Sequence, residues 1–350
     1  MLYNKIVRDD CDKIIENISL HNFKKKNVLI LGSNSFLASY ISAVLAQGNA
    51  QLNLKCNVDC ISKNDPHSLF DEIYKENKKF MTFSKINLEN IKLLKNKIYK
   101  KKYDFIFHCA TYAQPEKWLN NLSGTIFLNT ILLEELIRYS IKFKSKLMYF
   151  SSVDVYSDNK NKIIQENHKL GHPNDEYRSI YSLAKILGEQ ICKIYKKKFN
   201  FKTYIVRAAH TYGPGQSIND RRFISQTIKR ALIEKKVYIY GSGKSVKTWG
   251  YIAEIASMIL NIIQFGKSDI YNLTAKNYSS IEKIAKIIAK ETKVKFEKKK
   301  IGKNFVSKDY SIIKISSKKY HNEFIKKPIS ISIHTGLKRF LEWSKISIKK

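Results

Sequence analysis

Short apolar runs alternate with amphipathic segments along most of this chain. A continuous apolar run bounded by small or polar residues predicts a buried strand, and apolar residues three or four apart predict a helix. Strands are expected at Val28–Leu31, Val58–Ser62, Phe80–Phe83, Lys202–Val206 and Ile270–Leu273, and at the starts of Tyr103–Ala113 and Leu147–Tyr156. Helices are expected after the first strand, from Pro66, Glu89, Arg222 and Ile252, around Tyr181, and at Thr125–Ser140, Ser280–Thr292 and Leu337–Trp343.

This alternation predicts the α/β class, with a Rossmann-like, doubly wound parallel sheet and a smaller C-terminal lobe. We expect residues 26–206 to form the dinucleotide-binding domain and residues 207–350 to form mainly the second lobe, interleaved with the first. Residues 1–25 read as a helical or irregular lead-in whose Ile14, Ile15 and Ile18 can pack on the body. The basic stretch 296–327 has poor periodicity and no assigned element.

The first strand leads into a candidate phosphate-binding turn. Gly32, Ser35 and Ala38 follow it at a spacing of three, and a helix comes next. A strand, a tight turn and a helix in this order are the context of a dinucleotide fingerprint. Ser35 departs from that fingerprint, since a glycine usually lets the backbone approach the pyrophosphate, but its hydroxyl can donate to a phosphate oxygen. Phe36 and Leu37, which open the helix, are expected beside the cofactor.

Residues after the next strands are candidates for the adenosine side of the cofactor. Ser62 and Lys63 stand where an acid usually holds the adenosine ribose. A basic residue there favours a 2′-phosphate, so NADP is an alternative to NAD; the other interpretation is a solvated surface lysine. Asn87 and Leu88 are placed to line an adenine pocket.

The strand that begins at Tyr103 ends in small residues, which let a cofactor lie across its tip. His108 on this strand is expected to be a packed histidine, because no second ligand stands at metal-binding spacing. The cofactor contacts expected directly after it are Cys109, Ala110 and Thr111.

Tyr181 and Lys185 are four residues apart in a segment with helical periodicity, so they stand one turn apart on the same side. A lysine ammonium beside a phenol favours the phenolate, which suits proton exchange near neutral pH. Ser152, at the end of a strand, can hydrogen-bond the same substrate oxygen. A half-buried tyrosine beside a solvated lysine is the alternative, since the chain has 21 tyrosines.

Composition adds an excess of positive charge. The 350 residues carry 64 Lys+Arg against 30 Asp+Glu, a formal net charge of +34. The lysines are scattered in short groups, so we expect solvated faces and no specific nucleic-acid partner. Five cysteines without a C-x-x-C pair predict a reducing compartment and no structural zinc. No apolar run is long enough for a membrane span, and the start lacks a signal-peptide core, so a cytoplasmic location is expected.

The ordered motifs resemble the extended short-chain dehydrogenase/reductase family of nucleotide-sugar enzymes, among them UDP-glucuronate decarboxylases and dTDP-glucose 4,6-dehydratases. The matching pieces run from about residue 24 to 344. They are the Gly32 loop, H-C-A-T-Y-A-Q-P, S-S-V-D-V-Y, Tyr181-x-x-x-Lys185, R-A-A-H-T-Y-G-P-G and G-L-K-R-F-L-E-W.

The resemblance implies tightly held NAD, a nucleoside diphosphate sugar as substrate, and oxidation at the sugar 4-position as the first step. It implies that Tyr181 takes the hydroxyl proton, Ser152 orients the oxygen, and Lys185 holds the nicotinamide ribose. Asp154 falls where dehydratases and decarboxylases carry a glutamate base, with a surface aspartate as the alternative. Val153 replaces the acid of dTDP-glucose dehydratases. Substrate contacts are expected from Gln114, Asn129, Arg207, His210, Arg222 and Lys247.

Several alternatives stay open at this stage. The reaction is expected to be of the 4,6-dehydratase or epimerase type, feeding surface-polysaccharide synthesis, with decarboxylation as a variant. An NADPH-dependent 4-keto-sugar reductase and a catalytically silent or nucleic-acid-binding relative are the other hypotheses. The Thr125–Ser140 segment and the Tyr181 helix are the two long apolar helices that we expect to pair in a homodimer.

Overall fold

A computed structural model describes residues 5–156, 163–172, 176–267, 269–276, 278–300, 312–324 and 329–349. Its centre is a seven-stranded sheet in which every strand pairs in parallel with its neighbours. The spatial order is β11 (Ile270–Leu273), β7 (Thr203–Ala208), β5 (Lys146–Ser152), β4 (Phe105–His108), β1 (Asn27–Leu31), β2 (Asn57–Ser62) and β3 (Met81–Lys85). The predicted doubly wound α/β fold is therefore confirmed.

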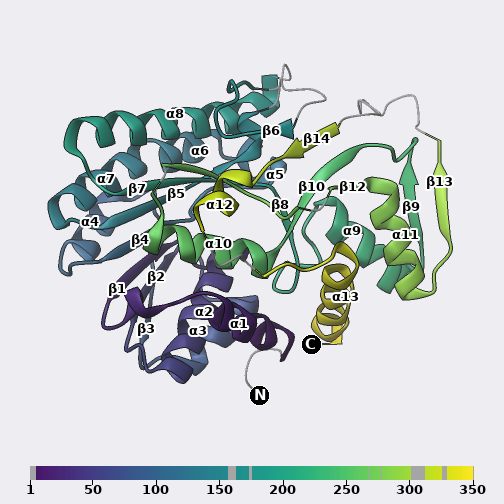
Figure 1. The fold of residues 1–350 in the computed structure, drawn as a ribbon, viewed down its shortest axis with the longest axis horizontal. Coiled ribbons are helices and arrows are strands. Elements are labelled where there is room, and N and C mark those ends of the chain that lie inside the picture. Colours follow the sequence, from purple (N-terminus) through teal and green to yellow (C-terminus); the bar gives the residue numbers. More distant parts are fainter. Residues whose placement is uncertain are drawn as a thin grey trace.

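Helices cover both faces of this sheet, as Figure 1 shows. One face packs under α1 (Lys5–Asn17), α2 (Phe36–Leu52), α3 (Ser68–Glu76) and α10 (Ile252–Phe265). The other packs under α4 (Ile91–Ile98), α6 (Leu122–Asn129), α7 (Ile131–Phe143) and α8 (Glu176–Phe199). Successive residues of β1 divide between the two cores: Val28 and Ile30 enter the first, and Leu29 and Leu31 enter the second. Burial on both sides explains why the strand is apolar throughout.

A smaller lobe is built around a second sheet. Its strand order is β12 (Tyr278–Ser280), β10 (Val246–Tyr251), β14 (Ile312–Ile315) and β6 (Ile163–Ile164), and β8 (His210–Tyr212) also pairs with β10. A separate parallel pair joins β9 (Val237–Tyr240) to β13 (Phe296–Lys299). The helices here are α9 (Phe223–Lys229), α11 (Ile281–Thr292) and α13 (Ile333–Lys349), and α12 (Lys318–Glu323) packs near β11. The chain crosses between the sheets several times, because β11 and α10 belong to the first.

Two details differ from the sequence prediction. The segment Thr125–Ser140 is not one helix: α6 ends at Asn129, and Thr130 has φ −126° and ψ −76°, outside the helical region, before α7 begins. The stretch 296–327 contributes β13, β14 and α12, although residues 301–311 and 325–327 lie outside the described part.

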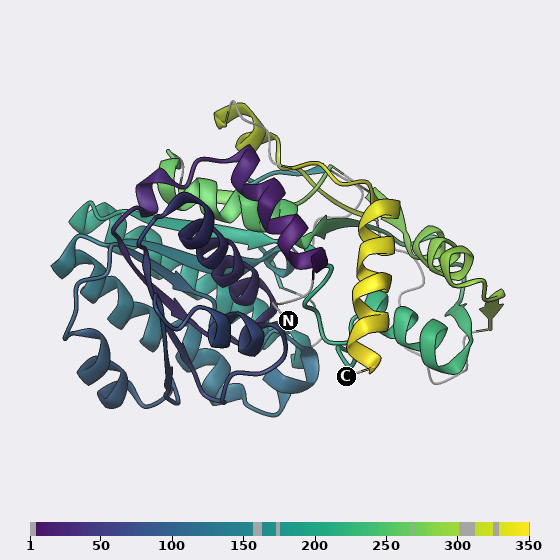
Figure 2. The same ribbon diagram turned by 90° about the horizontal axis from the view of Figure 1, so that it is seen from below.

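The N-terminal lead-in contains a docked helix. Ile14 and Ile18 of this segment are buried, and Ile15 packs against the same core. Asp10 of α1 is fully buried and accepts hydrogen bonds from Tyr40 (2.7 Å), Tyr251 (2.6 Å) and Arg339 (2.7 Å). Arg339 belongs to α13, so this carboxylate connects the two ends of the fold, which Figure 2 shows near one another.

Candidate active site

The end of β5 and one face of α8 bring together the three residues of the predicted proton-transfer group. Ser152 is the last residue of β5, and its Oγ donates to Asp154 Oδ2 at 3.1 Å while it accepts from the Asp154 backbone N–H at 3.2 Å. The Ser152 hydroxyl also lies close enough to the Tyr181 phenol to lower its pKa, so the strand end and α8 meet here. Asp154, Ser152 and Tyr181 therefore form one continuous polar cluster.

Lys185 lies one helical turn after Tyr181 and is almost fully buried. Its Nζ donates to the Phe150 backbone oxygen at 2.5 Å and lies 4.9 Å from the Tyr149 ring centroid and 5.7 Å from that of Tyr181. Burial lowers the pKa of Lys185 to about 7, although Cys109 and Glu189 act in the opposite direction. Burial lowers the pKa of His108 to about 3, and the positive charge of Lys185 contributes to this.

The expected lowering of the Tyr181 pKa is wrong for this structure. Burial raises the pKa of the phenol, and the Asp154 charge raises it further, while the neighbouring Ser152 hydroxyl lowers it. Desolvation outweighs the lysine because the Lys185 ammonium donates to a backbone carbonyl. Tyr181 is thus a neutral phenol at pH 7.

Trp118 is a site residue that sequence reasoning missed. It lies in α5 (Pro115–Leu119) and is buried, and its ring stacks on that of Tyr181 at 6.3 Å with an interplanar angle of 20°. The stacked indole covers one face of the phenol and excludes water from it. Its position shortly after the strand-end segment H-C-A-T was the signal available in the sequence.

The turn after β1 has the features of a phosphate cradle. Gly32 has φ +77°, and a Cβ there would lie 2.8 Å from the Ala110 Cα, so the turn requires glycine. Ser35 is the N-cap of α2, and the buried oxygens Ser33 Oγ, Asn34 Oδ1 and Ser35 Oγ have no hydrogen-bond partner in the described part of the chain. Unpartnered polar groups at a helix N-terminus suit an anionic ligand, so these residues fit the pyrophosphate of a dinucleotide.

The other predicted cofactor contacts lie along the same edge of the sheet. Lys63 is exposed and forms no ion pair with any described residue, whereas Ser62 is buried at the end of β2. Leu88 is buried, and the exposed Asn87 accepts from the Glu89 backbone N–H. Further members of this edge are Phe36 and Leu37, which open α2, and Cys109, Ala110 and Thr111, which follow β4.

Two of the predicted substrate contacts point into the protein instead. Arg207 is 1% exposed and pairs with Glu189 through Nε–Oε1 (2.8 Å) and Nη2–Oε2 (2.5 Å). Asn129 is fully buried. Its side-chain Nδ2 donates to Thr111 Oγ1 and to the Thr125 carbonyl, and its Oδ1 accepts from the Tyr149 hydroxyl. Both were expected to contact the substrate, but each bonds to partners inside the protein.

Three of the remaining predicted contacts, His210, Arg222 and Lys247, lie near one another where β8 pairs with β10. His210 lies on β8 and packs edge-on against Trp249 of β10. Burial lowers its pKa to about 3, and the positive charges of Lys247 and Arg222 contribute to this. Arg222 also holds Asp220, with Nη2–Oδ2 at 2.7 Å. Gln114 is the N-cap of α5, the helix that carries Trp118. Arg222 and Lys247 offer positive charge to a diphosphate, and the neutral His210 lies beside them.

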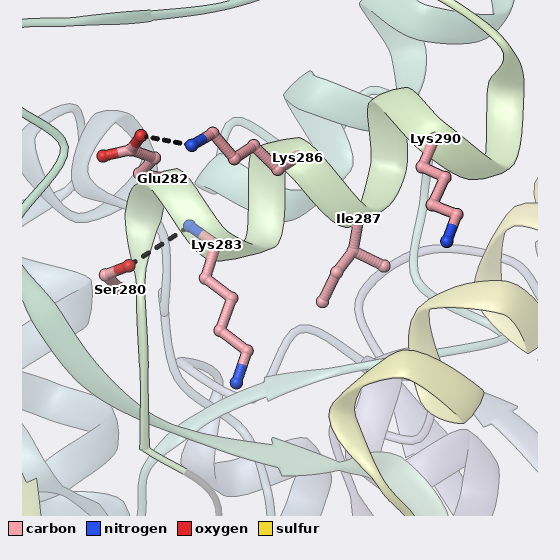
Figure 3. Close-up of a pocket in the computed structure, with 6 residues that line it drawn as sticks. All are labelled: Ser280, Glu282, Lys283, Lys286, Ile287 and Lys290. Carbon is pink, nitrogen blue, oxygen red and sulfur yellow. Dashed lines mark hydrogen bonds and ion pairs between the residues drawn. The ribbon is translucent and has the colours of Figure 1, made fainter.

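Other features of the surface lie apart from this cluster. A pocket of about 340 Å³ on the small lobe borders α11, and Figure 3 shows its lysines along that helix. It is lined by Ser280, Glu282, Lys283, Lys286, Ile287 and Lys290.

All five cysteines are buried and free of disulfides. Within the described residues, no group of histidine, cysteine and acidic side chains is arranged to hold a metal, and no helix could cross a membrane.

A family model described as "NAD dependent epimerase/dehydratase family" matches residues 28–274. A dTDP-D-glucose 4,6-dehydratase of Dictyostelium discoideum is 28% identical over 284 residues, which cover 75% of this chain and 62% of the relative. UDP-glucuronic acid decarboxylase 1 of Xenopus tropicalis is 24% identical over 274 residues, which cover 75% of this chain and 60% of the relative. The chain thus matches about 60% of the length of these relatives.

Solved structures share the whole architecture. An epimerase from Methanothermobacter thermautotrophicus superposes with a TM-score of 0.80 at 18% identity, covering 99% of this chain and 97% of the other. UDP-glucuronic acid 4-epimerase from Bacillus cereus, solved with UDP-glucuronic acid and NAD, gives a TM-score of 0.75 at 20% identity and covers 92% of this chain and 99% of the other. At this level of identity the likeness establishes the fold.

Proposed function

This chain is a member of the NAD dependent epimerase/dehydratase family, and from that premise we propose that it modifies a nucleoside diphosphate sugar, beginning with oxidation at the sugar 4-position. The observation that carries the proposal is the grouping of Asp154, its hydrogen-bond partner Ser152 and the neighbouring Tyr181, with the Lys185 ammonium 5.7 Å from the centre of the phenol ring. Bound NAD supplies a reversible hydride acceptor.

In this proposal each side chain has one task. Ser152 donates a hydrogen bond to the sugar 4-oxygen and orients it, and Tyr181 receives the hydroxyl proton as general base. Tyr181 must first release its own proton to solvent, before the substrate closes the site, and the neighbouring Ser152 hydroxyl favours the phenolate that remains. Trp118 keeps bulk water away from the phenol. Arg222 and Lys247 bind the diphosphate through their positive charges, and His210 lies beside them as a neutral imidazole.

Asp154 supports a step that follows the oxidation. A 4-ketone acidifies the neighbouring carbon, and a carboxylate beside it can remove that proton. Asp154 is exposed next to Ser152, whereas Val153 is buried and brings no acid. We therefore favour a dehydratase that uses Asp154 as base over a 4-epimerase, which needs no such base, and we place its product in surface-polysaccharide synthesis.

The test is turnover of nucleoside diphosphate hexoses by the purified chain and by Tyr181→Phe. The variant should lose about 10²–10⁴-fold in rate, the usual contribution of a general acid–base group, and should keep its circular dichroism and its bound dinucleotide. Mass spectrometry of the small molecules released on denaturation identifies the cofactor. Full activity in Tyr181→Phe contradicts the proposal, and stoichiometric consumption of NADPH would select a 4-keto-sugar reductase, the hypothesis that the exposed Lys63 favours.

A further inference from the structure

A buried ion pair lies directly behind the catalytic cluster. Glu189 of α8 is fully buried, and both of its carboxylate oxygens accept from Arg207 of β7. Ser151 of β5 donates to the same carboxylate at 2.7 Å. The Arg207 guanidinium also donates to the Tyr156 hydroxyl and, at 3.0 Å, to the Glu166 backbone oxygen. Its nitrogens face protein groups, so the pair is closed to a substrate.

This pair connects the elements that carry the catalytic side chains. Glu189 stands one turn after Lys185 and two turns after Tyr181 on α8. Ser151 immediately precedes Ser152 on β5. A shift of the strand along the helix would therefore break the bond between Ser151 and Glu189 at the same time as it displaced Ser152 from Tyr181.

We propose that the Glu189–Arg207 pair is a positioning device for the catalytic cluster, which fixes β5 against α8 and sustains the positive charge on Lys185. This inference rests on the proposed function of the cluster. A buried ion pair is otherwise a costly way to join two elements, because apolar residues of similar size often give equal stability. The negative charge of Glu189 favours the ammonium form of Lys185, which an apolar contact could not do.

The surroundings of Lys185 explain why that charge matters. His108 of β4 and Cys109 directly after it face the ammonium, β5 presents Tyr149 and the Phe150 carbonyl, and α8 presents Tyr181 and Glu189. Burial acts against the ammonium, and Glu189 acts for it. Removing the carboxylate while Arg207 stays in place should therefore make Lys185 lose its proton at lower pH. Removing the guanidinium while Glu189 stays should do the reverse.

The first experiment compares pH profiles of kcat for Glu189→Gln and Arg207→Met. The alkaline limb that reports Lys185 should move down by about one pH unit in Glu189→Gln and up by a similar amount in Arg207→Met. Ser151→Ala removes the link to the strand and keeps both charges, so kcat should fall about ten-fold with the limb unmoved. A role in packing alone would lower kcat in all three variants without opposite shifts, and that result would overturn the proposal.

A second readout needs no activity. The folded pKa of Lys185 is about 7 and the unfolded pKa is about 10.4, so the unfolded chain binds more protons between these values and wild-type stability rises with pH there, relative to Lys185→Met. This rise should start at lower pH in the Glu189→Gln background and at higher pH in the Arg207→Met background. If either single variant does not fold, the neutral pair Glu189→Gln/Arg207→Met should fold with an onset below that of the wild type, because Glu189 is the member that favours the ammonium.

The two proposals fail separately. Opposite shifts in the stability measurement support the positioning device even if the wild-type chain turns over no nucleotide sugar, a result that would contradict the proposed function alone. Shifts in the same direction, or none, overturn the device whatever the activity.

Discussion

Gly32 joins β1 to α2 at the point where the backbone turns towards Ala110. Its φ of +77° and the 2.8 Å that would separate an added Cβ from the Ala110 Cα leave no room for a side chain. The neighbouring Ser35 hydroxyl has no partner in the described structure. The ends of β1 and β4 approach each other closely here, and the Ser35 hydroxyl is available at the N-terminus of α2. Both features suit the binding of a phosphate group.

Gly32→Ala should therefore weaken dinucleotide retention and lower the free energy of unfolding by about 1–3 kcal/mol, the usual cost of a side chain at positive φ. Isothermal titration with NAD and urea denaturation measure the two effects. Gly48→Ala is the matched control, because it lies inside α2 and its methyl group would meet flexible leucine side chains. Equal behaviour of the two variants would show that the turn tolerates a side chain.

The sequence alone identified the candidate catalytic residues that can be recognised by their local spacing. Tyr181 and Lys185 are four apart on one helix, and Ser152 ends a strand, so their meeting follows from the order of elements. Arg207 was assigned wrongly because its partner Glu189 is 18 residues away on another element. The sign of the Tyr181 pKa shift was missed for a related reason, since burial by Trp118 and the direction of the Lys185 ammonium are properties of the folded chain.

At the scale of elements, α8 has two different faces. One carries Tyr181, Lys185 and Glu189 into the protein, and the other exposes Leu183 (42%) and Leu187 (51%). The neighbouring α6 exposes Ile126. An apolar stripe across two adjacent helices is typical of a helix-mediated interface between subunits.

Periodicity predicted most elements, but it could not predict the break at Thr130, where neither proline nor glycine marks the end of α6.

If the homodimer expected from the sequence forms through this stripe, Leu187→Glu should convert it into monomers, because a carboxylate would be buried without a partner in a symmetric interface. Light scattering coupled to gel filtration gives the molar mass. Leu93→Glu is the control: Leu93 is equally exposed, at 53%, but lies on α4. A wild-type chain that elutes as a monomer would contradict the homodimer and would leave the proposed catalytic function unaffected.

At the scale of the whole molecule, the first and last helices are joined across the sheet edge. Asp10 accepts from Tyr40, Tyr251 and Arg339, which belong to α2, β10 and α13. Burial raises the pKa of Asp10, while Arg339 opposes that rise. The lead-in is thus part of the core, although its sequence indicated only a few isoleucines able to pack.

Asp10→Asn should lower the free energy of unfolding by about 3–5 kcal/mol, since it leaves Arg339 half-buried without its anion. Urea denaturation at pH 7 measures this loss. Asp71→Asn breaks the solvent-exposed pair with Lys75 and should cost less than about 1 kcal/mol. Similar losses in both variants would mean that the buried carboxylate has no special role.

The bond between Asp10 and Arg339 also sets an order of events during synthesis. The two residues are 329 positions apart, so the carboxylate leaves the ribosome long before its cation does. Until α13 has emerged, a nascent chain holds an acid that has no counter-charge in the place where α1 must settle. Closure of the molecule through this pair therefore waits until α13 has been made.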